Sequence, residues 1–492
     1  MIVGERRPNF SRKPGREFAF IPRIINPVKM ANALVLSAGE EVRQAGRVLQ
    51  ERMPWVKTQV LSSPTSVSDY RSDQASVFIF DDTALTIIDA DKIREKNRDA
   101  VLVLLTSNPF IYCSPPQVAR EKFPYTSKSD LVFAMNNKDF PPQQVITSVV
   151  RAAEDLLNIE KYSRAKRFIF LIVDDEPRWF SQFLPVLYGI IGQRADVMIT
   201  RTYEETLRFL FGVEKESEID KEGYRFLGYG DDVVCLITDI FFPKGNDLSC
   251  DAGIDLLRLA REYYPRYPII IASKARVADE LKDVGFVLPK GDPGSLEKLR
   301  DYLQNFTGMG DFVVCDKTGE ELRRAKNIHE VYELILEAEK ETDEARKLRE
   351  LIQVYADNDH FSTWLYMHSF RELGDLLRPQ QSKGRALFST LKRHLRREIL
   401  RMDYTPLNIE GNKIFELDDL LRLLRTVNAD KLQPFSDNDA FSSWLDRKGY
   451  PELAEEFRPI HMSGEKLRET LVHLVEKWVG IYRGNNGENG CG

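Results

Sequence analysis

Short apolar runs alternate with helix-patterned segments between residues 31 and 160. Nearly continuous apolar strands separated by helices are typical of a parallel sheet that is covered on both faces. The pattern therefore predicts a five-stranded, doubly wound α/β domain over residues 31–160. Its expected strands lie at 33–39, 56–63, 76–82, 100–107 and 130–137.

The same pattern starts again at residue 167 and predicts a second five-stranded α/β domain over residues 165–306, in tandem with the first. Its expected strands are RFIFLIVDD (167–175), ADVMITRT (195–202), DVVCLITDIFF (232–242), YPIIIASK (267–274) and GFVLPKG (285–291). The expected helices begin near Trp179, Glu204, Gly253, Arg276 and Ser295. An acidic, polar stretch at 213–232 is expected to form an exposed loop.

A repeat replaces the strands beyond about residue 308. Residues 357–379 align without gaps to residues 437–459, with 11 of 23 positions identical. Each copy follows a glycine turn and an amphipathic helix, which predicts two helical modules at 308–400 and 403–483. Phe, Trp and Leu recur in both copies at the i, i+3, i+4 spacing of one helix face, at 361, 364 and 365 and at 441, 444 and 445. We expect this stripe to form each module's core rather than a ligand cage.

The two ends of the chain lack such patterns. Residues 1–30 are rich in Arg, Pro and Gly and carry a net charge of +5 from seven Lys and Arg against two Glu. They are expected to form a flexible basic arm. The tail at 484–492 is expected to be disordered.

Composition excludes several classes of protein. The chain of 492 residues has a formal charge of −6, so the part outside the basic arm is acidic, which argues against broad nucleic-acid binding. No run of about 18 uncharged apolar residues and no secretory signal occurs. Five scattered cysteines argue against a disulfide framework or a cysteine zinc site. These features together predict a cytoplasmic protein without a membrane partner.

Three carboxylates follow neighbouring strands of the second domain. Asp174 and Asp175 end its first strand, and Asp239 ends its third. The carboxyl ends of parallel strands meet at one crevice, where ligands bind. Carboxylates crowded there repel one another, and a hard divalent cation with oxygen ligands relieves that repulsion. The sequence therefore predicts a Mg²⁺ site.

A hydroxyl and an ammonium face the same crevice. Ser273 ends the fourth strand and Lys290 ends the fifth. Together with the metal, they can bind the three oxygens of a phosphoryl group that is attached to a carboxylate.

This constellation resembles the receiver domain of response regulators, and the resemblance covers residues 167–306. It implies a flavodoxin-like fold in which Asp239 is the phospho-acceptor. Asp174, Asp175 and the main-chain carbonyl of Phe241 would hold Mg²⁺ together with Asp239. Ser273 and Lys290 would bind the phosphoryl group, and Pro243 matches the proline that receivers carry four residues after the acceptor.

Three positions depart from the usual receiver. Lys274 follows Ser273, where receivers have a small residue, and Val287 stands where a switching aromatic residue is common. The loop between Asp239 and Gly253 is about six residues longer than in a minimal receiver. These departures bear on access to the phosphoryl group and on switching more than on phosphoryl binding.

Two longer stretches, 172–192 and 238–262, are similar to the receiver of large bacterial proteins related to phosphoenolpyruvate synthase. The segment from 310 to 379 resembles the region C-terminal to the receiver in those proteins. Beyond it this chain has no phosphohistidine or nucleotide-binding domain, so synthase activity is not expected.

The first domain has the receiver outline without its chemistry. Ser37, Ala38 and Gly39 stand where the acidic pair is expected, and Asn136 and Asn137 stand where the lysine is expected. Asp81 and Asp82 end its third strand, and Thr106 ends its fourth. We therefore interpret residues 31–160 as a pseudo-receiver that does not accept phosphate.

Other motifs add little. The chain has no phosphate-binding glycine loop and no HExxH pair. The segment 383–402 carries Lys and Arg at helical spacing, but a solvated helix paired with neighbouring Glu is the favoured interpretation. DNA binding stays as a weak alternative.

The resemblance thus implies a non-enzymatic response regulator whose phosphorylation changes protein contacts. Its expected partners are a histidine kinase or another phosphodonor and an unidentified output protein, with a homo-oligomer possible. Two alternatives remain open: a regulatory subunit of a separate phosphotransfer enzyme, and a scaffold that is not phosphorylated.

Overall fold

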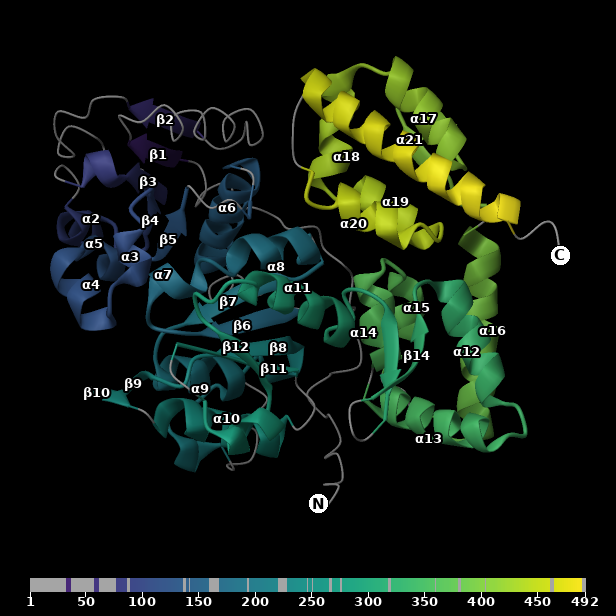
Figure 1. The fold of residues 1–492 in the computed structure, drawn as a ribbon, viewed down its shortest axis with the longest axis horizontal. Coiled ribbons are helices and arrows are strands. Elements are labelled where there is room, and N and C mark those ends of the chain that lie inside the picture. The colour runs from purple at the N-terminus through teal and green to yellow at the C-terminus, as the bar shows by residue number, and fades with distance from the viewer. Residues whose placement is uncertain are drawn as a thin grey trace. The chain divides into compact units, whose positions relative to one another are not determined.

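The fold is that of a computed structural model of the full chain. It describes residues 32–36, 57–61, 77–85, 89–135, 139–140, 142–158, 168–192, 194–219, 228–245, 247–249, 251–264, 268–274, 277–316, 320–358, 360–378, 382–402, 404–460 and 464–488. The chain divides into two compact units. One contains the described residues of Tyr162–Glu176 and Ala195–Asp292, and the other contains those of Pro22–Lys161, Pro177–Arg194 and Pro293–Gly492. Figure 1 labels the helices and strands.

The first sheet has five parallel strands in the order β2-β1-β3-β4-β5. They are β1 (Asn32–Leu36), β2 (Lys57–Leu61), β3 (Val77–Asp81), β4 (Val101–Thr106) and β5 (Leu131–Ala134). The helices of this region are η2 (Asp82–Ala84), α2 (Ala90–Lys96), α3 (Phe110–Cys113), α4 (Pro116–Lys122), α5 (Tyr125–Lys128) and α6 (Pro142–Asn158). All five predicted strands are confirmed, because each coincides with one of the apolar runs.

Helices cover both faces of this sheet. Phe78, Leu102 and Val132 pack with Ala90 and Ile93 of α2 in one buried cluster. Helix α6 packs against β4 and β5. The edge strand β5 also has a neighbour from outside the sheet, because the Val132 N–H donates to the buried Ser181 hydroxyl at 3.0 Å.

The second sheet also has five parallel strands, in the order β12-β11-β8-β6-β7. They are β6 (Ile169–Val173), β7 (Asp196–Thr200), β8 (Val233–Thr238), β11 (Ile269–Ser273) and β12 (Phe286–Pro289). In sequence order both sheets read 2-1-3-4-5, one of the common arrangements of doubly wound sheets. The five strands predicted for the second domain are thereby confirmed.

Helices follow the strands of this sheet, and one of them has a side-chain cap. They are α7 (Pro177–Phe180), α8 (Leu184–Ile191), α9 (Tyr203–Phe211), η4 (Glu216–Glu218), η6 (Gly230–Asp232), α10 (Asp251–Tyr263), η7 (Asp279–Asp283) and α11 (Ser295–Phe306). The Thr202 side chain caps α9 by accepting from Glu205 N, and Gly212 ends the helix at a φ of 78°. The helix predicted near Arg276 is only the short η7, because Gly285 and β12 follow closely.

Two predicted loops have more structure than expected. The extended segment after Asp239 forms an antiparallel hairpin of β9 (Phe242–Lys244) and β10 (Asp247–Ser249). In the acidic stretch predicted to be an exposed loop, Val213 and Ile219 are buried, so that expectation is wrong for these two residues, whereas Glu214, Lys215 and Ser217 are exposed. The burial of Val213 and Ile219 is favourable because it removes the apolar surface of both side chains from water.

The C-terminal region is mostly helical, as predicted, and contains two similar modules. The first consists of β13 (Phe312–Cys315), β14 (Glu321–Ala325), α12 (Ile328–Ala338), α13 (Asp343–Asp357), α14 (His360–Met367), α15 (Arg371–Leu376) and α16 (Arg385–Met402). The second consists of β15 (Leu407–Ile409), β16 (Asn412–Ile414), α17 (Leu417–Thr426), η8 (Ala429–Lys431), α18 (Gln433–Asp437), α19 (Ala440–Arg447), α20 (Pro451–Phe457) and α21 (Gly464–Glu488). Each module opens with a two-stranded antiparallel hairpin, which the sequence pattern had indicated only as a glycine turn.

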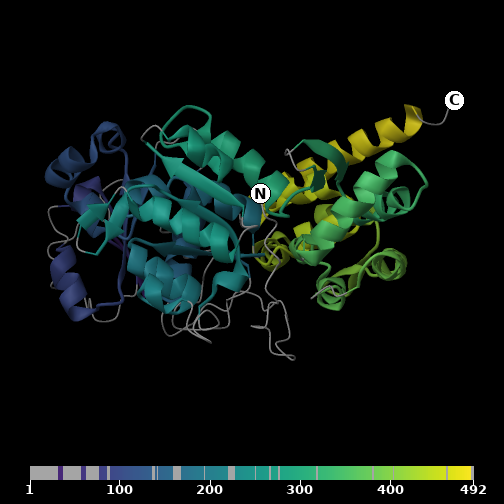
Figure 2. The same ribbon diagram turned by 90° about the horizontal axis from the view of Figure 1, so that it is seen from below.

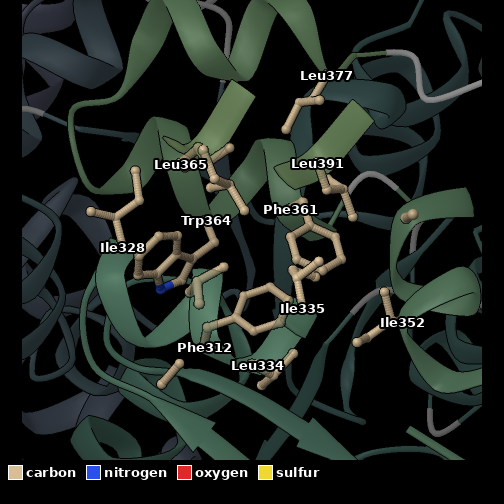
Figure 3. Packing of buried hydrophobic residues seen from close by; sticks show 14 of the residues in the cluster. Phe312, Ile328, Leu334, Ile335, Ile352, Phe361, Trp364, Leu365, Leu377 and Leu391 are labelled. Atoms are coloured by element: carbon tan, nitrogen blue, oxygen red, sulfur yellow. The ribbon is translucent and has the colours of Figure 1, made fainter. Parts of the chain in front are cut away.

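The aromatic stripe forms the core of each module, as predicted. Figure 3 shows Phe361 and Trp364 packed beside Phe312. The ring centroids of Phe312 and Phe361 are 4.6 Å apart. The second module has its own cluster around Phe441 and Trp444. Each module therefore has a separate hydrophobic core.

The final helix is longer than expected. Helix α21, which leads to the C-terminus in Figure 2, packs on α17 and continues to Glu488. The predicted disordered tail therefore begins at least five residues too early, because helix extension adds a hydrogen bond for each residue fixed. The predicted basic arm lies outside the described residues. None of the described helices is both long enough and apolar enough to cross a membrane.

Candidate functional site

The ends of four strands of the second sheet bring the predicted residues to one edge. Asp174 follows β6, Asp239 follows β8, Ser273 closes β11 and Lys290 follows β12. Because all five strands are parallel, these four positions share the carboxyl edge of the sheet.

Lys290 links the two aspartates. Its Nζ lies 2.6 Å from Asp174 Oδ2 and 2.5 Å from Asp239 Oδ2. The side chains of Lys290 and Asp174 are only 1% and 2% exposed, whereas Asp239 is 14% exposed. Asp239 is therefore the carboxylate of the three-residue cluster that a reactant can reach from solvent.

Main-chain hydrogen bonds hold both carboxylates in place. Asp174 Oδ1 accepts from Glu176 N at 3.0 Å, and Asp239 Oδ1 accepts from Ile240 N at 2.6 Å. Each aspartate thus keeps one oxygen on the backbone and the other on the ammonium. Such fixed groups lose little entropy when a ligand binds.

Burial and mutual repulsion perturb the charges of this cluster. Burial, together with the negative charge of Asp239, raises the pKa of Asp174 to about 7, although Lys290 opposes the shift. Burial opposes the charge on Lys290, but Asp174 and Asp239 hold its pKa above its usual value. The cluster therefore contains more acids than bases. One ammonium lies against two carboxylates, and a third carboxylate, that of Asp175, follows Asp174 in the chain.

The remaining predicted residues lie at the same edge with less direct contacts. Ser273 is buried, and its carbonyl accepts from Lys290 N at 3.0 Å. Asp175 is half-buried beside Asp174 in the chain. Phe241, whose carbonyl was predicted as a metal ligand, stands two residues after Asp239 with a side chain 40% exposed.

The donor set suits Mg²⁺ in its chemistry. Three carboxylates and one ammonium leave a formal charge of −2, and oxygen is the ligand that this ion prefers. In the residues that the structure describes, however, no three His, Cys, Asp or Glu side chains converge as a ready metal site. The Lys290 ammonium lies between Asp174 and Asp239 instead. Metal binding would therefore require this ammonium to leave at least one carboxylate.

The hairpin after Asp239 is anchored rather than loose. Lys244 binds Asp255 and lies 3.2 Å from Glu216, and its Nζ lies 4.3 Å from the centre of the Tyr203 ring. Gly245 N donates to Glu204 at 2.9 Å. Nothing in the sequence pattern indicated these contacts, because Glu216 belongs to the stretch predicted to be an exposed loop.

A glycine lets helix α10 approach the backbone that follows β8. Gly253, in the first turn of α10, donates its N–H to Ile240 O at 3.0 Å. A Cβ at this position would lie 2.5 Å from the Cα of Ile240. The backbone just after Asp239 therefore depends on a residue without a side chain here.

The first domain has a different arrangement at its corresponding edge. Both Asp82 carboxylate oxygens accept from the Thr106 hydroxyl, at 2.8 and 2.9 Å, and Ser107 N donates to Asp82 at 3.0 Å. Asp81 is buried. Ser37, Ala38, Gly39, Asn136 and Asn137 lie outside the described residues. The described part of this edge is occupied by internal hydrogen bonds.

Sequence reasoning missed the buried arginines, among them Arg178 and Arg194. Arg178, three residues after Asp175 in the chain, donates to the carbonyls of Ile111 at 2.5 Å and Ser114 at 2.8 Å. Arg194, just after α8, donates to the carbonyls of Met309 and Met367. In the sequence each is a lone arginine without any pattern that distinguishes it from a surface residue.

Comparisons with known proteins give little further guidance. No family model and no curated protein matches the chain. One solved structure, described as a two-component system response regulator/GGDEF domain protein, is 17% identical, with a TM-score of 0.26. The match covers 56% of this chain and 98% of that one. An NAD⁺-bound 3-phosphoglycerate dehydrogenase from Entamoeba histolytica is 12% identical, covers 57% of this chain and 92% of its own, and has a TM-score of 0.17. Neither likeness is close enough to carry an argument, so the function must be argued from the site.

Proposed function

We propose that this chain is a phosphorylation-dependent signalling protein of the response-regulator type, in which Asp239 accepts the phosphoryl group. One observation carries the proposal: a buried lysine bridges a buried aspartate and a more exposed aspartate at the carboxyl edge of a parallel sheet. The 2-1-3-4-5 strand order and the buried Ser273 at the neighbouring strand end support it.

The proposed chemistry uses groups of this edge, a phosphodonor and Mg²⁺. An Asp239 carboxylate oxygen attacks the phosphorus of a phosphohistidine or a small acyl phosphate. The bond between phosphorus and the leaving group breaks, and its electron pair departs with that group, which leaves an acyl phosphate on Asp239. Lys290 then moves from the carboxylate to a phosphoryl oxygen, and Ser273 donates to another. Mg²⁺, held by Asp174, Asp175, Asp239 and the Phe241 carbonyl, would neutralise the charge that is transferred.

The rest of the chain fits a signalling role without catalysis. In this proposal the first domain is a pseudo-receiver, since the Asp82 carboxylate is already bound by Thr106 and Ser107. The two C-terminal modules form the output and change their protein contacts when Asp239 is phosphorylated.

Labelling with acetyl phosphate in the presence of Mg²⁺ tests the proposal. The wild-type chain should take up phosphate, and Asp239→Asn should not. Asp81→Asn, at the end of the third strand of the first domain, is the matched control and should label like wild type. Equal labelling of wild type and Asp239→Asn would contradict the assignment, and a clear loss in Asp81→Asn would contradict the pseudo-receiver.

A further inference from the structure

The structural repeat extends further than the aligned motif. With the same offset of 80 residues, helix α16 corresponds to α21, and the glycines that begin them, Gly384 and Gly464, both have positive φ. The buried residues of the two helices follow the same register: Leu387, Leu391 and Leu395 in one, and Leu467, Leu471 and Val475 in the other. Shared positions therefore build each module's own core.

The two modules contact each other through residues that differ between the two copies of the repeat. His368 of the first module corresponds to Lys448 in the second, and Asp446 of the second corresponds to Tyr366 in the first. His368 Nδ1 lies 2.8 Å from Asp446 Oδ1, and each side chain is only 4% exposed. Neither copy contains both partners at these two positions. The pair therefore joins one module to the other.

The surroundings of the His368 ring require two N–H groups. Nδ1 faces the Asp446 carboxylate, and Nε2 lies 2.8 Å from the Gly310 carbonyl oxygen. Both partners can only accept hydrogen bonds, so both contacts are satisfied only when the imidazole carries both protons. The Trp364 ring stacks on the imidazole with a centroid separation of 4.2 Å and keeps water from one face.

Charges around this pair favour an ionised Asp446. Burial alone would raise its pKa, but His368 and, beyond it, Arg458 and Arg194 hold that pKa below its usual value. The other charged groups at the junction are Glu455, which accepts from Arg458 at 2.9 Å, and Asp439, whose carboxylate faces Gly192. The junction therefore contains a buried histidine-carboxylate pair among two arginines and two further acids.

Arg194 connects this junction to the end of α8. It donates to Met309 O at 3.1 Å and to Met367 O at 2.9 Å, and it also donates to Ile190 O. Its guanidinium lies 3.7 Å from Glu455 of the second module. Met367 directly precedes His368, so loss of the His368 contact disturbs the same turn that Arg194 holds.

We propose that docking of the second module onto the first depends on protonation of His368. With both protons present, the ring bridges Gly310 and Asp446. When one proton leaves, a ring nitrogen faces an acceptor without a hydrogen between them, and docking weakens because hydrogen bonds to a charged partner are the strong ones. The contact thus holds the two C-terminal modules together in a proton-dependent way, and it does so whether or not Asp239 is phosphorylated.

Asp446→Asn is the decisive variant because it removes the need for the second proton. An asparagine amide can donate to a neutral Nδ1, while the Nε2–H still donates to Gly310. The amide oxygen then takes the place of Asp446 Oδ2, for which the described structure gives no hydrogen-bond partner. Docking in this variant should therefore not depend on pH.

Hydrogen exchange with mass spectrometry on the full chain measures docking. The segment 438–448 and the described residues 190–192 and 194 should lose protection by about tenfold or more between pH 5.5 and 8.5 in wild type, after correction for intrinsic exchange. Asp446→Asn should show no such change, whatever its absolute protection. Lys448→Gln, at the equivalent of His368 in the second copy, is the control and should behave like wild type.

Nitrogen-15 spectra of selectively labelled histidines provide an independent readout, with His368 assigned from His368→Gln. The wild-type ring should show two protonated nitrogens at the acid end of this range. A neutral ring there, constant protection in wild type, or the same loss of protection in Asp446→Asn would overturn the proposal. Labelling of Asp239 would be unaffected by any of these results.

Discussion

The Tyr188 hydroxyl donates a 2.6 Å hydrogen bond to the Asp155 carboxylate, and both residues are buried. Tyr188 belongs to α8 and Asp155 to α6, so the bond ties the last helix of the first domain to the second helix after β6. The Arg151 guanidinium lies 4.6 Å from the centre of the same ring.

Tyr188→Phe should lower the free energy of unfolding by about 1.5–3 kcal/mol, because a buried carboxylate loses a charge-assisted hydrogen bond while the ring packing is kept. Urea denaturation of the full chain gives the value. Tyr404→Phe, at a residue 82% exposed, should change it by no more than about 0.5 kcal/mol. Similar effects of the two substitutions would show that the buried bond contributes nothing specific.

Asp174→Asn should stabilise the chain at neutral to alkaline pH. Because burial raises the pKa of Asp174 to about 7, the folded state holds its proton over a range in which the unfolded chain has lost it. Stability contributed by this group therefore falls as pH rises from about 4 to 7 and stays low above that. The variant should gain on the order of a few kcal/mol at pH 8 and almost nothing at pH 4.

Denaturation at both pH values, with and without Mg²⁺, checks this prediction. Magnesium should stabilise wild type and not the variant, since the metal needs the carboxylate. A variant that is less stable than wild type at pH 8 without metal would show that the Lys290 contact outweighs the burial of charge.

Lys274→Ala should shorten the half-life of phosphorylated Asp239, by ~10-fold if ~1.4 kcal/mol of barrier is lost. The Lys274 side chain is exposed immediately after the buried Ser273, where it can shield an acyl phosphate from water and pair with one of its oxygens. Decay after removal of the donor, in excess Mg²⁺, gives the rate. An unchanged or longer half-life would leave Lys274 without a role.

The indole N–H groups of the two repeated tryptophans should contribute differently to the free energy of unfolding. Trp364 Nε1 donates to Gly310 O at 2.9 Å, whereas the buried Trp444 Nε1 has no hydrogen-bond partner in the described residues. Trp→Phe removes similar packing at both positions, so Trp364→Phe should cost about 1 kcal/mol more. Chemical denaturation of the two variants compares them directly, and a larger cost at Trp444 would contradict the assignment of the bond.

The strands and the acidic site could be predicted from sequence for a clear physical reason. Buried parallel strands are apolar throughout, and parallel strands end at one edge, so Asp174, Asp239 and Lys290 had to lie close together. The buried arginines could not be predicted in the same way. Arg194 binds carbonyls 115 and 173 residues further along the chain, and main-chain acceptors leave no mark in a sequence.

The hairpins and the His368 contact could not be predicted from the sequence either. The hairpins are only three to five residues a strand, so they leave little periodicity, and the turn glycine was their clearest signal. In the sequence, His368 and Asp446 are two of the mismatches in an otherwise similar repeat. Their significance depends on how two copies pack, which a single copy does not encode.

The hydrogen bond from Val132 N to Ser181 has a consequence for aggregation. Strand β5 ends its sheet, and an open strand edge is a template on which another chain can add a strand. Ser181 occupies one of the outward-facing donors, and β5 also packs against α7. A fragment that ends after α6 would lack this cover. It should self-associate more readily than the full chain, even though its sheet and hydrophobic core are intact.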